Sequence, residues 1–191
     1  MASIVEYDIV LSRMRERGLE SQYFNSGAFG FGSGVPTYVA GWIGPQDPTI
    51  RAGARQFTRN VPMPYAATLA DLAALAWQKV LPGPAWIMPK SHWAYELDYG
   101  SKAWLPDALR NTGVNPAALE ARNNAPAIEF LPDETPRFTA FVRSLLENLV
   151  GSDFSLAFPD HPVICTIHHH KQLWWVGDNQ AIVQGIEGLI R

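Results

Sequence analysis

Three consecutive histidines, His168, His169 and His170, are the residues of this sequence best suited to bind a metal ion. Neutral imidazole is the most common metal ligand in proteins. If the segment is a strand, His168 and His170 lie on one face about 7 Å apart at the backbone, and His169 points to the other face. The two side chains on the shared face could then bind one divalent metal such as zinc.

A third metal ligand would have to come from elsewhere in the chain. His92 is the preferred candidate, and His161, Glu96 and Asp98 are further polar candidates. No His-Glu-x-x-His spacing and no Cys-His cluster supports the assignment. The competing interpretation is the polar end of a hairpin, with the imidazoles in solvent or against neighbouring tryptophans.

Polar residues alternate with aromatic and apolar ones over residues 92–99, and this alternation predicts a strand. Glu96 and Asp98 would share its polar face, about 7 Å apart. Such a carboxylate pair could act on a common substrate or activate a metal-bound water. The simpler interpretation is the solvent-facing side of a half-buried sheet, where charged residues are common.

Two further groups of residues could bind a ligand. In a strand, Trp174 and Trp175 place one indole on each face, and an exposed indole beside the histidines would suggest a binding surface, unless a helix covers it. Arg51 and Arg55 are four residues apart, so on a helix they would share one face and could bind a carboxylate or phosphate. Because Gly53 lies between them, a basic surface loop is the simpler interpretation.

Other possible sites have weaker support. The glycine-rich segment 27–34 fits neither the dinucleotide-binding nor the P-loop spacing, and Phe29 and Phe31 suggest instead a loop packed on the core. Cys165 alternates with Val163 and Ile167, so it should be a buried, unreactive thiol. As the only cysteine of the sequence, it also excludes an internal disulfide.

Composition narrows the class of protein. The 191 residues fit a single globular domain, 1–191, with 47% apolar and 17% charged residues. A net charge of −3 argues against binding to nucleic acid or to acidic lipid surfaces. We find no signal peptide and no apolar run of membrane-spanning length, so a cytoplasmic location without membrane contact is expected.

The pattern of elements predicts an α+β fold, a mainly antiparallel sheet with helices packed on it. Ser3 and Glu6 resemble a capping box before a first helix, whose apolar stripe includes Tyr7, Val10 and Met14. Further helices are expected over about 68–81, in two short segments near 100–120, over about 135–150 and from Asp178 onwards. Strands are expected near 37–43, 85–88, 92–99, 127–131, 154–158, 163–168 and 173–176. The connections between the last three strands are too short for parallel crossovers.

These observations favour a non-enzymatic binding or interaction protein, of a regulatory or immunity type, whose partner is a protein or a small ligand. This hypothesis requires no cofactor. The alternative is a hydrolase-like, metal-dependent enzyme with His168 and His170 as ligands and Glu96 or Asp98 as the base. The sequence does not indicate the oligomeric state.

Overall fold

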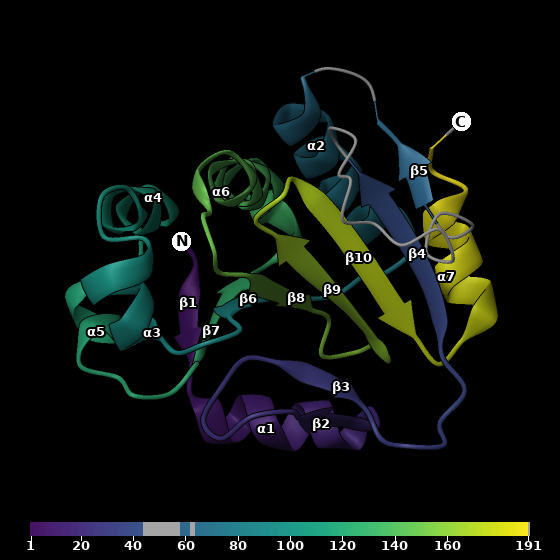
Figure 1. Ribbon diagram of the computed structural model, residues 1–191, viewed down its shortest axis with the longest axis horizontal. Coiled ribbons are helices and arrows are strands. Elements are labelled where there is room, and N and C mark those ends of the chain that lie inside the picture. The colour runs from purple at the N-terminus through teal and green to yellow at the C-terminus, as the bar shows by residue number, and fades with distance from the viewer. Residues whose placement is uncertain (44–57, 62–63, 191) are drawn as a thin grey trace.

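The computed structural model describes residues 1–43, 58–61 and 64–190, and it has the α+β architecture expected from the sequence (Figure 1). In these ranges one sheet has the strand order β1-β7-β6-β8-β9-β10-β4-β5, and β2 and β3 form a separate two-stranded sheet. Neighbouring strands of the large sheet are antiparallel, except that β4 and β5 are parallel. The strands are β1 Ser3–Val5, β2 Leu19–Ser21, β3 Phe29–Phe31, β4 Tyr38–Ile43, β5 Thr58–Asn60, β6 Ala85–Pro89, β7 Ala127–Phe130, β8 Phe154–Ala157, β9 Val163–His168 and β10 Gln172–Gly177.

Helices cover both faces of the large sheet. In Figure 1, α1 and the β2–β3 hairpin lie below the sheet, and α2 and α6 lie above it. The helices are α1 Tyr7–Glu16, α2 Tyr65–Lys79, α3 Trp93–Tyr95, the π-helix η2 Glu96–Gly100, α4 Leu105–Thr112, α5 Ala117–Glu120, the 3₁₀ helix η3 Pro132–Glu134, α6 Thr135–Asn148 and α7 Gln180–Glu187. In the described part of the chain, no helix has the length and apolar character needed to cross a membrane.

The larger core lies between the sheet and the helices α2, α4, α6 and α7. The helix expected over about 135–150 is confirmed as α6, and its apolar side chains Phe138, Phe141, Val142 and Leu145 are all buried. Burial of one such side chain stabilises the fold by about 1.5–3 kcal/mol. Periodic apolar residues therefore give this helix its place on the sheet.

The second core lies on the opposite face, where α1 and the hairpin meet β6. Tyr7, Val10 and Met14 of α1 are buried as expected and pack in one cluster with Trp86 and Met88. The predicted capping box is wrong, because residues Ser3–Val5 form β1 and pair with β7. Pairing with β7 satisfies backbone groups that a longer helix would otherwise have bonded.

The strand predicted over residues 92–99 is also wrong, because this segment forms α3 and η2. Trp93 and Leu97 are four residues apart and both buried, which fits a helical turn as well as a strand. Tyr95 and Tyr99, predicted to share their face, are exposed instead. The Nδ1 of His92 accepts the Tyr95 N–H at 3.2 Å, which begins the helix.

Two smaller differences concern turns. The segment 27–34, expected to be a loop packed on the core, contains β3 of the β2–β3 hairpin, and Phe29 packs on the core as that prediction required. The last helix begins one residue later than expected, because the side chain of Asn179, and not that of Asp178, accepts the N–H groups of Ala181 and Ile182.

One end of the large sheet brings together segments that are far apart in the sequence. Because β6, β8, β9 and β10 are antiparallel neighbours, β6 and β9 end where β8 and β10 begin. The N–H of Lys90, just after β6, donates to the carbonyl of Asp153, just before β8, at 2.9 Å. The histidine run lies between β9 and β10 at this same end of the sheet.

Candidate metal centre

A three-residue turn connects β9 to β10 and carries the histidines. His168 pairs with Gln172, and the Lys171 N–H donates to the His168 carbonyl at 3.0 Å. Lys171 has a φ of 58°, the left-handed conformation that ends a three-residue hairpin loop. The strand thus stops at His168, and the expected strand alternation does not extend to His169 and His170.

The turn gathers all three imidazoles. Their ring centroids are 4.3 Å apart for His168 and His169, 4.2 Å for His169 and His170, and 5.0 Å for His168 and His170. One nitrogen from each ring lies within 4.8 Å of the other two. Tetrahedral zinc with Zn–N bonds of 2.0–2.1 Å requires nitrogens about 3.4 Å apart. Side-chain rotations that move each nitrogen by about 1 Å would therefore suffice to form a three-histidine site.

Asp153 orients the turn from the neighbouring strand. Its Oδ1 accepts two hydrogen bonds from His169, one from the ring Nδ1 at 2.9 Å and one from the backbone N–H at 3.1 Å. Since a carboxylate only accepts, the Nδ1 of His169 carries the proton and its Nε2 is left with a free lone pair. A histidine held through one nitrogen by a carboxylate, with the other nitrogen available, is the usual arrangement in metal sites.

His168 is less fully prepared. Its Nδ1 accepts the backbone N–H of His170 at 3.1 Å, and its Nε2 is 4.0 Å from Oδ2 of Asp153. In this tautomer the ring proton is on Nε2. Coordination through Nδ1 takes the lone pair that accepts the His170 N–H, and coordination through Nε2 moves the ring proton to Nδ1. Either way the hydrogen bond from the His170 N–H is lost. The loss of one such hydrogen bond costs about 0.5–1.5 kcal/mol, which is small beside the free energy of a metal–imidazole bond.

Electrostatics favours the neutral form of His168. Burial lowers its pKa, the neighbouring His169, His170 and Lys90 lower it further, and Asp153 only partly opposes them. His168 and His169 are 26% and 25% exposed, and His170 is exposed. Neutral imidazole is the form that binds metals, so the turn keeps at least His168 ready for coordination at neutral pH.

The other predicted ligands lie elsewhere in the described part of the chain. His92 is outside the three-histidine group, and its Nδ1 is used to begin α3. His161 lies at the other end of β9, with its Nε2 2.8 Å from the Pro82 carbonyl. The side chain that the structure places beside His168 and His170 is that of His169, and not one from a distant segment.

The predicted carboxylate pair is not formed. Glu96 is fully buried and accepts hydrogen bonds from three serine hydroxyls, whereas Asp98 is exposed. The prediction that Glu96 and Asp98 share one face was wrong because it assumed a strand. The segment forms η2 instead, which turns the two side chains in different directions. Arg51 and Arg55 lie outside the described residues.

The two tryptophans point to opposite faces of β10, as the sequence indicated. Trp175 is fully buried, stacks on Phe158 and meets Trp42 edge to face. Trp174 is partly exposed on the other face, and its Nε1 donates to Oε1 of Gln172 at 2.8 Å. The final helix α7 packs with Trp175 in the larger core, so it covers that face of the strand.

Sequence reasoning missed Asp153 and Lys90. In the sheet, Phe154 pairs with Ile167, which places Asp153 opposite His168. A lone aspartate between Ser152 and an apolar strand gives no signal of its own. Only the register of β8 and β9 identifies it as the partner of the histidine turn.

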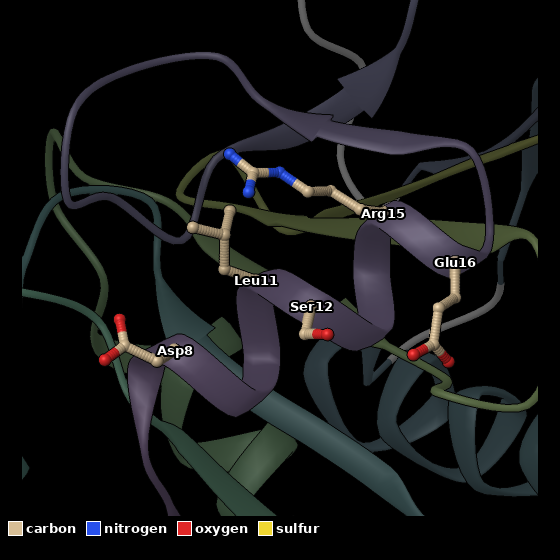
Figure 2. A pocket seen from close by; sticks show the side chains of 5 residues that line it. All are labelled: Asp8, Leu11, Ser12, Arg15 and Glu16. Atoms are coloured by element: carbon tan, nitrogen blue, oxygen red, sulfur yellow. The ribbon is translucent and has the colours of Figure 1, made fainter.

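A shallow hollow beside α1 has a different character. Figure 2 shows Leu11 and Arg15 directed toward the hairpin, whereas Asp8, Ser12 and Glu16 extend along the outer side of the helix. These polar groups diverge and do not surround one position. The hollow therefore shows no arrangement of groups comparable to the histidine turn.

Comparison with protein-family models, with curated proteins and with solved structures found no match for this chain. The geometry at the histidine turn is therefore the observation that bears most directly on function.

Proposed function

We propose that this protein is a binding protein that takes one divalent transition metal, such as zinc, at the histidine turn. The observation that carries the proposal is the gathering of one nitrogen each from His168, His169 and His170 within 4.8 Å. Imidazole ligands suit zinc, copper, nickel and iron. The proposal keeps the binding class that the sequence favours and adds a specific ligand.

Two features support a site that depends on the fold. The carboxylate of Asp153, directly before β8, holds His169 at 2.9 Å from its Nδ1. Outer-shell partners of this kind typically raise metal affinity 10- to 100-fold. A flexible histidine run has no such partner, so the folded protein should bind zinc more tightly than a peptide with the sequence of residues 167–172.

A hydrolytic role has less support than binding. Three histidines would leave a fourth metal position for water, as catalytic zinc sites do. The metal itself would lower the pKa of that water, and the hydrolase hypothesis adds Glu96 or Asp98 as the base. Glu96 is held by serine hydroxyls and Asp98 is exposed, and neither belongs to the histidine group. The metal-dependent hydrolase therefore remains the weaker alternative.

A second candidate function, interaction with a protein partner, is favoured by exposed aromatic side chains. Tyr23 and Phe24, in the loop between β2 and β3, are 72% and 93% exposed. Aromatic residues are enriched at protein interfaces. The loop is held in place because the Gly27 N–H donates to the Pro89 carbonyl and the Tyr7 hydroxyl donates to the Ser26 carbonyl. A regulatory or immunity-type partner would then require Phe24, and Phe24→Ala should abolish its binding.

Metal analysis of protein purified without an affinity tag tests the main proposal. We expect about one zinc per chain after incubation with zinc and dialysis, and loss of this zinc in His169→Ala. His161→Gln is the matched control, because His161 is about 20 Å away along β9 and should leave the stoichiometry unchanged. Zinc contents that are the same in His169→Ala and wild type would contradict the proposal.

The pH dependence of binding gives an independent check. Burial and the neighbouring positive groups lower the pKa of His168, so this ligand stays neutral to a lower pH than an ordinary imidazole. Protonation of His168 should therefore weaken zinc binding only as the pH falls below the ordinary imidazole pKa of about 6.5. Isothermal titration with zinc chloride between pH 5 and 8 measures this. An affinity that already falls between pH 8 and 7 would not fit coordination by His168.

A further inference from the structure

Glu96 is a fully buried carboxyl group whose hydrogen-bond partners are three hydroxyls. Ser91 Oγ donates to Oε1 at 2.7 Å, and Ser101 and Ser152 donate to Oε2 at 3.0 and 3.1 Å. Gly100 makes room for this arrangement, because a Cβ there would lie 2.7 Å from Oε2. A buried polar group of this kind is tolerated only when it is hydrogen-bonded, so the three serines are essential to it.

The three serines come from different segments. Ser91 follows β6, Ser101 follows η2, and Ser152 precedes β8. Glu96 itself lies in the π-helix, where the Ser101 N–H donates to its carbonyl at 2.7 Å. One carboxyl group thus fastens the ends of β6 and β8 to the same short helix.

Two of these serines flank the residues that hold Asp153. Ser91 follows Lys90, whose N–H donates to the Asp153 carbonyl at 2.9 Å, and Ser152 directly precedes Asp153. Glu96, Ser91, Lys90, Asp153 and Ser152 therefore form a closed ring of covalent and hydrogen bonds. The backbone of Asp153 is held on both sides by bonds that begin at Glu96.

We infer that Glu96 is a positioning residue for the histidine turn: through Ser91 and Ser152 it fixes Asp153, and Asp153 fixes the ring of His169. This inference rests on the proposed metal site and gives Glu96 a structural task there in place of acid–base chemistry. Metal ligands must be held to within about 0.5 Å by supporting groups if affinity is to be high. The ring supplies that support from outside the turn.

The serines provide matched variants that test the inference. Ser152→Ala removes the hydroxyl next to Asp153, and Ser101→Ala removes a hydroxyl from the same Glu96 oxygen without touching Asp153. Zinc affinity, measured by competition with a chelator, should fall about 3- to 10-fold in Ser152→Ala, less than the loss typical of a direct outer-shell partner. It should change less than about 2-fold in Ser101→Ala, and Ser152→Thr, which keeps the hydroxyl, should restore it. Urea unfolding of each variant separates changes in affinity from changes in stability.

A second measurement does not depend on zinc. Nitrogen-15 correlation spectra of the histidine rings report which nitrogen of His169 carries the proton. The wild-type protein and Ser101→Ala should show His169 protonated at Nδ1, and Ser152→Ala should show a mixture of tautomers. Equal zinc affinities and equal tautomers in Ser152→Ala and Ser101→Ala would overturn the inference. If wild-type protein fails to bind zinc but the tautomers differ as expected, the metal proposal fails, and the positioning of His169 by the ring still holds.

Discussion

Replacement of Asp153 by alanine removes the carboxylate that holds His169 in the proposed site. The variant loses the acceptor for the His169 ring at 2.9 Å and for the His169 backbone N–H at 3.1 Å. It also removes the negative charge 4.0 Å from the Nε2 of His168. All three histidines remain in the sequence, so any change in zinc affinity reports the contribution of the carboxylate.

The size of the effect follows from these contacts. Loss of an outer-shell carboxylate lowers metal affinity about 10- to 100-fold, which is about 1.4–2.7 kcal/mol of binding free energy. The zinc-free protein should lose less, about 1–2 kcal/mol of unfolding free energy, because Asp153 is 22% exposed and water replaces part of the lost hydrogen bonding. Zinc affinity should therefore be the more sensitive quantity.

Chelator competition gives the zinc affinity, and urea unfolding without zinc gives the stability. Asp178→Ala is the matched control, since Asp178 is exposed just beyond the other end of β10 and should change neither quantity. If Asp153→Ala binds zinc as tightly as the control, the carboxylate does not orient a ligand.

Three further predictions concern the fold around the site. Gly27→Ala should destabilise the protein by about 1–3 kcal/mol in urea unfolding, because its Cβ would overlap the Pro89 carbonyl and the Met88 side chain. Gly32→Ala should be nearly neutral, because a Cβ at Gly32 would lie 3.6 Å from the nearest side-chain atom. Equal stabilities of the two variants would contradict the packing of this loop. Trp175→Ala should cost about 3–5 kcal/mol and Trp174→Ala less than half of that, because only Trp175 is fully buried; the reverse order in thermal unfolding would mean that the faces of β10 are exchanged. Burial raises the pKa of the Cys165 thiol well above its usual value, so a thiol reagent at pH 8 should label the protein only after unfolding, and rapid labelling of the native protein would refute the burial.

Local sequence determined much of the secondary structure, because periodic burial leaves a readable pattern. The stripe of Phe138, Phe141 and Leu145 predicts α6 with nearly its observed bounds, and the alternation of Val163, Cys165 and Ile167 predicts β9. The order of elements from β7 to α7 and the antiparallel pairing of β8, β9 and β10 follow from short connections. These features depend on residues that are neighbours in the sequence.

Where the spacing of residues fits both a helix and a strand, tertiary contacts decided which of the two forms. Trp93 and Leu97 can share a face in a strand or in a helix, and the hydrogen bonds of His92 and Ser101 select the helix. Ser3 and Glu6 are spaced as a capping box, yet β7 offers a pairing partner to residues Ser3–Val5. In both places the sequence alone is ambiguous, because the competing structures differ only in contacts with distant segments.

The residues of the candidate site also fall into those that the sequence identified and those that only the tertiary structure placed there. The sequence by itself identified the histidine run, since three imidazoles in succession are visible without any fold. It could not identify Asp153, which lies 15 residues before His168 and becomes its neighbour only through the register of β8 and β9. Nor could it assign Glu96 to the support of Asp153, because that depends on hydroxyls from three segments meeting in one place. Residue type determines which groups can bind a metal, and only the packing of strands determines which groups hold them in place.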